Sequence, residues 1–247
     1  MSTPGTTPRP LSPTARSTVR RGANRARSDR RDLDNVLSSA AICQLGVIVD
    51  GHPLVLPTAF GYDLDGPDDD GSLYLHGSVA SRSIRQSPGN DICVSMTVLD
   101  GLVLARSAFH HSMNYRSAVV IGRGRLVDEP DEKARALDLI VDHAVPGRAA
   151  TLRPHTRKEL AATSVIALPL AEASVKVRTG DPVDEESDVA AGGWSGVLPV
   201  RLVAQEPVTA ADARGEAVPP EVQARGGSPR VLRGKMRLPS YDFPKGR

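Results

Sequence analysis

Two apolar runs joined by a tight turn constrain the fold of this chain most strongly. Residues 41–49 (AICQLGVIV) are rich in β-branched side chains, and residues 53–62 (PLVLPTAFGY) form a second run of strand type. Asp50-Gly51 between them is a preferred hairpin turn, because both of its positions readily adopt positive φ. The sequence therefore predicts an antiparallel hairpin. Pro57 places its second strand at a sheet edge or at a bulge.

Similar runs recur along the chain and are separated by turn residues. Further strands are predicted at 72–76, 91–109, 116–127, 164–178 and 194–203, and short helices at 28–37, 77–86, 130–143 and 156–162. Six to seven strands at hairpin spacing favour an antiparallel barrel over a doubly wound sheet. We therefore expect a mainly β fold with short peripheral helices. No G-x-G-x-x-G follows a strand and no P-loop pattern occurs, so Rossmann and P-loop nucleotide binding find no support.

The charges are segregated along the 247 residues. Residues 1–31 have a net charge of +7, residues 32–206 of −9, and residues 207–247 of +4. Both ends are poor in periodic apolar residues and rich in Arg and Pro, which predicts little structure. The expected organisation is a disordered basic arm over residues 1–27, a folded domain over 28–206, and a largely disordered tail over 207–247.

The folded part is acidic and the chain has only 3% aromatic residues, which does not fit a nucleic-acid-binding core. We therefore expect no nucleic-acid partner, although contacts through residues 9–31 stay open as an alternative. No apolar stretch approaches the roughly 20 residues that span a bilayer, and the N-terminus lacks the apolar region of a secretory signal. The expectation is a cytoplasmic protein without membrane contact.

A candidate anion site follows the strand at 72–76. That strand ends at His76, Gly77 permits a tight turn, and Ser78 is a suitable helix N-cap. The free N–H groups of the first helical turn would then lie beside hydroxyl and guanidinium groups, those of Ser81, Arg82, Ser83 and Arg85. Arginine binds phosphate bidentately, so this cluster suits a phosphate group. A capped helix with surface arginines is the alternative interpretation.

Other residues with chemical potential give weaker signals. His110 and His111 are adjacent, so they do not face a common metal ion, and no third ligand has a matching spacing nearby. No metal site is therefore predicted. Trp194 is the only tryptophan of the chain and begins the last predicted strand.

Five short segments in order resemble the pyridoxamine 5′-phosphate oxidase-like superfamily of FMN-binding split β-barrels, and within it the nitroimidazole-resistance-protein-like branch. They are the opening helix, PLVLPTAFGYD, LYLHGSVASR, NYRSAVVIGRGR and WSGVLPV. The similarity runs from about Arg27 to Val203. It implies a six- to seven-stranded antiparallel split barrel that binds FMN between the two subunits of a homodimer.

The resemblance also assigns site residues. Flavin-ring contacts would come from backbone groups around Pro57 and Thr58, because Val55 and Phe60 replace the Arg and Lys of the family's oxidases. The remaining matches are Leu75 and His76 before the phosphate-binding helix, Ser81 and Arg82 at the phosphate clamp, and Ser117 and Trp194 beside the isoalloxazine. His76 matches a histidine close to the flavin in the nitroimidazole-resistance branch, so it is the candidate catalytic residue.

These matches imply an FMN-dependent oxidoreductase that acts on an unidentified small molecule. No segment after Trp194 resembles the R-L-H-D-R-like sequence that holds the vitamin substrate in true oxidases, so oxidation of vitamin B6 is not expected. The alternatives are a reductase that uses a deazaflavin (F420) cofactor and a non-catalytic protein that binds flavin or haem.

Overall fold

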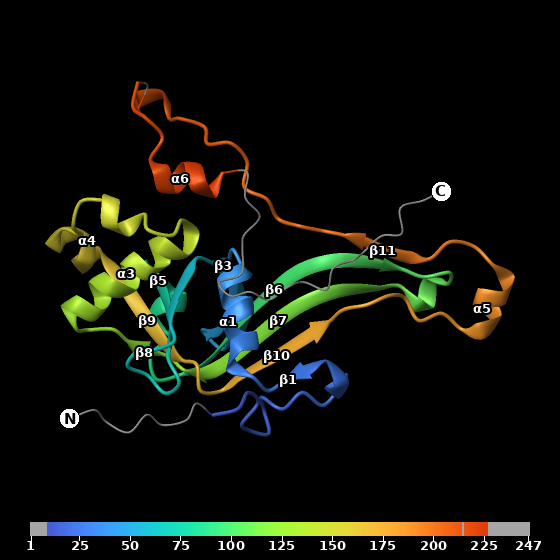
Figure 1. The fold of residues 1–247 in the computed structure, drawn as a ribbon. Coiled ribbons are helices and arrows are strands. Elements are labelled where there is room, and N and C mark those ends of the chain that lie inside the picture. Colours follow the sequence, from blue (N-terminus) through green and yellow to red (C-terminus); the bar gives the residue numbers. More distant parts are fainter. Residues whose placement is uncertain (1–8, 214, 227–247) are drawn as a thin grey trace, which may run out of the picture.

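A computed structural model describes residues 9–213 and 215–226, which form two antiparallel sheets with short helices around them (Figure 1). The larger, seven-stranded sheet has the order β1 (Ala26–Arg27), β10 (Ala173–Arg178), β7 (Ser112–Arg123), β6 (Asp91–Leu104), β2 (Cys43–Val49) and β3 (His52–Thr58), and β11 (Gly196–Pro199) pairs with β6. The smaller sheet has the order β4 (Phe60–Asp63), β5 (Ser72–Ser78), β9 (Thr163–Pro169) and β8 (Arg125–Leu126). The expected mainly β split barrel is confirmed.

The helices lie at the periphery of the two sheets (Figure 1). The α-helices are α1 (Arg30–Ser39), α2 (Arg82–Arg85), α3 (Pro130–Ala144), α4 (Arg157–Ala162), α5 (Glu186–Ala191) and α6 (Pro220–Arg225). The 3-10 helices are η1 (Ala23–Arg25), η2 (Ala108–His110), η3 (Ala149–Thr151) and η4 (Ala211–Ala213). In the described part of the chain, no helix combines the length and the apolar character needed to cross a bilayer.

The predicted hairpin is present and its turn has the expected backbone. Asp50 and Gly51 have φ values of 51° and 81°, and Val49 pairs with His52 across the turn. β3 is the last strand of the larger sheet, which confirms the edge position indicated by Pro57. An edge position leaves much of β3 exposed, including Val55.

Two apolar clusters hold the layers together. The main cluster lies between the sheets and includes Leu33, Val36 and Leu37 from α1, all with no exposed surface. A second cluster lies where α3 packs on the smaller sheet, and it contains Tyr74 and Ile140 among its six buried members. α3 approaches β4 so closely that a Cβ added at Gly61 would lie 2.7 Å from the backbone nitrogen of Ile140.

The N-terminal segment is ordered where the structure describes it. Leu11 is buried in the main cluster, and its main-chain N–H donates to the carbonyl oxygen of Ser28. Ala26 and Arg27 form β1 and pair with the edge of β10. The expected disordered arm over residues 1–27 is therefore wrong for residues 9–27, because an apolar anchor and an open strand edge hold this segment; residues 1–8 lie outside the described residues.

The C-terminal segment returns from β11 towards the α3 side of the molecule (Figure 1). There the Arg148 guanidinium lies 3.0 Å from the Glu221 carboxylate on α6. The expected tail over 207–247 thus contains structure in its first half, and residues 227–247 lie outside the described residues.

Some predicted boundaries differ from those observed. β5 extends through Ser78 because that residue pairs with Thr163 of β9, so α2 begins only after Ser81. The predicted strand at 91–109 is one strand, β6, with a bulge between Leu99 and Gly101. The acidic segment before Trp194 contains the short helix α5.

Candidate functional site

His76 lies near the end of β5 and has an unusual environment. It shares the face of Tyr74, which packs beneath α3, and it pairs with Val165 of β9. Its Nδ1 atom is buried and has no hydrogen-bond partner among the described residues. Burial lowers the pKa of His76, so the imidazole is neutral at pH 7. A neutral, unpaired imidazole is available to bind a metal or to hydrogen-bond a ligand.

Arg82 and Ser81, the predicted phosphate clamp, lie at the start of α2. The Arg82 guanidinium is 2.6 Å from the Asp50 carboxylate at the hairpin turn. Gln86 donates to the same carboxylate, and these two hydrogen bonds, first from Gln86 and then from Arg82, lower the pKa of Asp50. The Ser81 hydroxyl lies 3.0 Å from that of Ser83. The Arg82 side chain is exposed, and the Asp50 carboxylate already accompanies its guanidinium.

The sequence analysis also assigns Leu75, Pro57 and Thr58 to the site. The Leu75 side chain is buried in the main cluster, so only its main chain can contact a ligand. Pro57 and Thr58 lie at the end of edge strand β3, where Pro57 is exposed and Thr58 is partly exposed. Both positions remain candidates for contact with a ligand at the sheet edge.

Ser117 lies on the face of the larger sheet that points away from the main cluster. It pairs with Thr97 of β6 on one side and with Lys176 of β10 on the other. Its neighbours in β7, Ala118 and Val120, are fully buried, whereas Ser117 is partly exposed. Strand alternation therefore puts Ser117 and Lys176 on the outer face.

Trp194 is 71% exposed, although it is the largest apolar side chain of the chain. Its indole lies against Gly196, where an added Cβ would be 2.9 Å from the ring. An exposed tryptophan held against a glycine is suited to cover a ligand or a partner surface. It is not a core residue.

Arg106 fixes the segment that carries Trp194, and the sequence analysis did not identify it. Its guanidinium donates to the Gly193 carbonyl oxygen at 3.0 Å and to the Ser195 hydroxyl at 2.8 Å, the two residues that flank Trp194. It also bonds the buried carboxylate of Asp184 at 2.7 Å. Burial opposes ionisation of Asp184, but hydrogen bonds from the main chain and side chain of Arg106 hold its pKa below the ordinary value.

Replacing Arg106 with alanine should release Trp194. We expect the steady-state fluorescence anisotropy of this single tryptophan to fall, because the main chain on both sides of it loses its hydrogen bonds. Arg153→Ala, which removes an exposed ion pair with Glu159 elsewhere, is the matched control. Equal anisotropy in the two variants would show that Arg106 does not position Trp194.

One chain does not bring all the predicted residues together. His76, Ser81 and Arg82 lie beside the smaller sheet, whereas Trp194 precedes β11 at the far end of the long strands β6 and β7 (Figure 1). Within the described ranges, no three His, Cys, Asp or Glu side chains gather closely enough to hold a metal ion. The structure of one chain therefore separates Trp194 from His76, Ser81 and Arg82.

Comparison with known proteins identifies the family of this chain. The pyridoxamine 5′-phosphate oxidase family matches residues 29–177, which is more than half of the chain. The chain belongs to this family. Its similarity to the nitroimidazole-resistance branch is confirmed as a likeness of fold: a protein described as a candidate 5-nitroimidazole antibiotic resistance protein, from Bacteroides thetaiotaomicron, aligns with a TM-score of 0.50 and 24% identity, over 62% of this chain and 86% of the other.

Two solved structures of the pyridoxamine 5′-phosphate oxidase fold are more similar. The flavocytochrome Anf3 from Azotobacter vinelandii is 36% identical, with a TM-score of 0.79, over 87% of this chain and 99% of the other. An FAD- and haem-binding protein from Mycobacterium smegmatis is 38% identical, with a TM-score of 0.76, over 83% of this chain and 98% of the other. Among curated proteins, no match was found.

Proposed function

We propose that this member of the pyridoxamine 5′-phosphate oxidase family is a flavin-dependent oxidoreductase that also binds haem. The observation that carries the proposal is the likeness to two proteins that combine a flavin with haem, which extends over more than four fifths of the chain. FMN is the flavin implied by the sequence motifs, and FAD is the flavin named for the mycobacterial relative. Neither of these two relatives is described as binding a deazaflavin.

The residues present fit both cofactors. The unpaired, neutral imidazole of His76 has the chemistry of a haem-iron ligand, which is the commonest role of histidine towards haem. Ser81 and Arg82 offer hydroxyl and guanidinium groups to a flavin phosphate. Ser117 and Trp194 offer a small polar group and an aromatic face to the flavin ring.

When bound, flavin and haem supply hydride and single-electron transfer, and the protein supplies binding and orientation. Arg82 neutralises phosphate charge, and the Asp50 carboxylate fixes the direction of its guanidinium. Trp194, held by Arg106, excludes water from the face it covers. His76 keeps a neutral nitrogen available across the physiological pH range because its burial lowers its pKa.

The functional unit in this proposal is a homodimer with the flavin at the subunit interface. Trp194 precedes β11 at the far end of β6 and β7, away from the smaller sheet that carries His76, so a second copy would supply Trp194 to the phosphate clamp of the first (Figure 1). Exposed apolar side chains support such an interface, namely Ile48, Val55, Met113 and Leu198 on the larger sheet and Trp194 just before β11.

The visible spectrum of the purified protein tests the proposal. Flavin bands together with a Soret band are expected, and the flavin released by denaturation can be identified as FMN, FAD or a deazaflavin by chromatography. Reduction of both chromophores by a chemical donor, followed by reoxidation with an added acceptor, would support an enzyme. A colourless protein that takes up neither flavin nor haem on titration would contradict the proposal.

Replacing Arg82 with alanine should weaken flavin affinity about tenfold, because one charge-assisted contact to the phosphate is lost. Flavin fluorescence titration measures the effect, and far-UV circular dichroism should be unchanged because Arg82 is exposed. Asp50→Asn is the matched variant, since it leaves Arg82 in place and removes only the carboxylate that orients its guanidinium. Unchanged affinity in Arg82→Ala would remove Arg82 from the phosphate site.

A further inference from the structure

The long strands β6 and β7 end in a region that lies at the opposite end of the molecule from α3 and α4 (Figure 1). It consists of residues 105–111, which contain η2, and residues 179–195, which contain α5. Two contacts join these segments. Arg106 binds Asp184 at 2.7 Å, and the Nε2 atom of His110 lies 3.4 Å from the Glu185 carboxylate. We call this region the distal tip.

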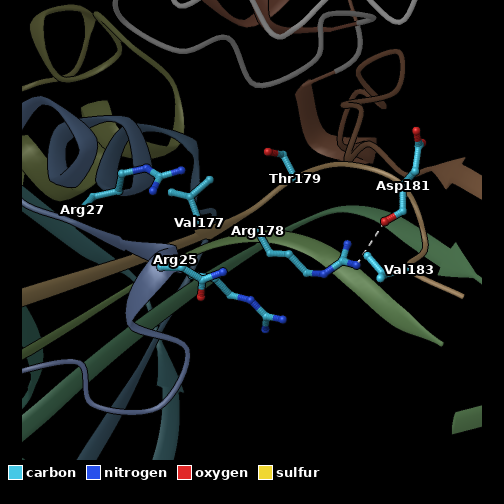
Figure 2. Close-up of a pocket in the computed structure, with 8 residues that line it drawn as sticks. Arg25, Arg27, Val177, Arg178, Thr179, Asp181 and Val183 are labelled. Atoms are coloured by element: carbon cyan, nitrogen blue, oxygen red, sulfur yellow. Dashed lines mark hydrogen bonds between the residues drawn. The ribbon is translucent and has the colours of Figure 1, made fainter. Parts of the chain in front are cut away.

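The distal tip exposes large apolar side chains. Phe109 is 90% exposed, and Val183, Val189 and Trp194 are each more than half exposed. Val183 lies just after β10, where it lines one side of a surface depression (Figure 2). Exposed apolar groups in one region of a folded protein mark a surface that contacts a partner.

The distal tip is also acidic. Residues 179–200 contain five Asp and Glu residues and no Lys or Arg. Asp184 is paired within the tip, but Glu185, Glu186 and Asp188 form no ion pair with Lys or Arg in the described part of the chain. A partner surface of positive charge would therefore complement α5 and the residue before it.

A surface of that charge lies where α2 and α4 meet. The main-chain N–H of Val79, between β5 and α2, donates to the carbonyl oxygen of Ala162, the last residue of α4. Arg85 on α2 and Arg157 and Lys158 on α4 are exposed and form no ion pair among the residues described. We call these three cations the basic face.

The basic face adjoins the phosphate clamp. Arg85 belongs to the same four-residue helix as Arg82. α4 has six residues, so Arg157 lies about 8 Å along the helix axis from the end that meets Val79. Trp194 follows α5 by only three residues, so α5 on the basic face would bring Trp194 close to the clamp.

One chain cannot make this contact, because its distal tip and its basic face lie at opposite ends of the molecule (Figure 1). Two copies related by a two-fold axis can make it twice, since each copy supplies one tip and one basic face.

We propose that the distal tip of each chain docks on the basic face of a second copy. The inference rests on the proposed function, in which a second copy supplies Trp194, and it names the contact that brings this tryptophan to the clamp. The opposite charges select the partner surface and its register. Phe109 and Val189 of the tip add apolar contact area, and Val79, which is 47% exposed, adds apolar area beside the basic face.

Charge reversal on each surface tests the contact. The full-length protein as purified is compared with a tip variant, Glu185→Lys/Glu186→Lys, and a face variant, Arg157→Glu/Lys158→Glu. The matched control is Arg20→Glu/Arg21→Glu, which reverses two adjacent exposed arginines on another surface. Sedimentation velocity measures the dimer dissociation constant, and quenching of the single tryptophan by bound flavin reports the position of Trp194. Circular dichroism checks that each variant is folded.

The tip variant and the face variant are each expected to dimerise at least tenfold more weakly than the wild type, because both attractive contacts of the dimer become repulsive. An equimolar mixture of the two should recover the wild-type affinity, since the lysines of one tip then meet the glutamates of the other face and the second contact is native. The control should dimerise like the wild type. Recovery on mixing identifies a direct contact, because neither misfolding nor a change in net charge is repaired in this way.

A monomeric wild type, a mixture that recovers no dimer, or a control as weak as the two variants would overturn the proposal. These results are distinguishable from failure of the proposed function, which the visible spectrum decides. A colourless protein whose two variants dimerise only when mixed would keep the docking contact and remove the oxidoreductase. Bound flavin and haem without recovery on mixing would keep the function and remove the contact.

Discussion

Replacing His76 with alanine should abolish haem binding while leaving most of the flavin in place. The expectation follows from the neutral imidazole of His76, whose Nδ1 has no partner among the described residues. Iron binding through a histidine is lost when the imidazole is removed, whereas the phosphate clamp at Arg82 is untouched. The absorbance ratio of the Soret band to the flavin bands measures the effect.

His155→Ala is a suitable control for this experiment. His155 lies just before α4, and its Nε2 atom is 2.9 Å from the Asp138 carboxylate, so its imidazole already has a partner. We expect that variant to retain haem. Loss of flavin from His76→Ala with haem retained would assign His76 to the flavin, as the sequence motifs imply, and would contradict a role as iron ligand.

Alanine at position 61 should destabilise the protein by about 3 kcal/mol, the upper end of the usual cost of overpacking. The added methyl group would lie 2.7 Å from the nitrogen of Ile140 and 2.8 Å from the carbonyl carbon of Leu139. Both atoms belong to the backbone of α3, so relief requires the helix to move away from the smaller sheet. Chemical denaturation at equilibrium measures the change.

The control for this prediction is Gly46→Ala in β2. There the nearest atom to an added Cβ is the carbonyl oxygen of Cys93, at 3.4 Å. We expect the free energy of unfolding to change by less than about 1 kcal/mol, the range of strand propensity differences. If both variants have the same stability, the close approach of α3 to β4 is not the limiting contact.

The parts of the fold that could be predicted are those with local signals. Asp50-Gly51 defines its hairpin because few residues accept positive φ at both turn positions. The apolar spacing over 130–143 likewise predicts α3. β1 could not be predicted, because Ala26-Arg27 has no strand character of its own and pairs only where β10 offers a free edge.

The candidate site also has a part with a local sequence signal and a part without one. His76 and Arg82 belong to one continuous segment, so their proximity could be read from the chain. Arg106 could not be identified, because its partner Asp184 is 78 positions away and an ion pair leaves no mark in a single sequence. The docking of the N-terminal segment escapes prediction for a related reason, because Arg16 binds Glu172, a partner 156 positions away.

The anchoring of the N-terminal segment has a consequence for protease sensitivity. Arginine-rich chains are good trypsin substrates when they are free, but cleavage needs a locally extended and detached backbone. Leu11 in the main cluster and β1 on β10 oppose this detachment. The rate of cleavage at the arginines of this segment would thus report its local opening equilibrium.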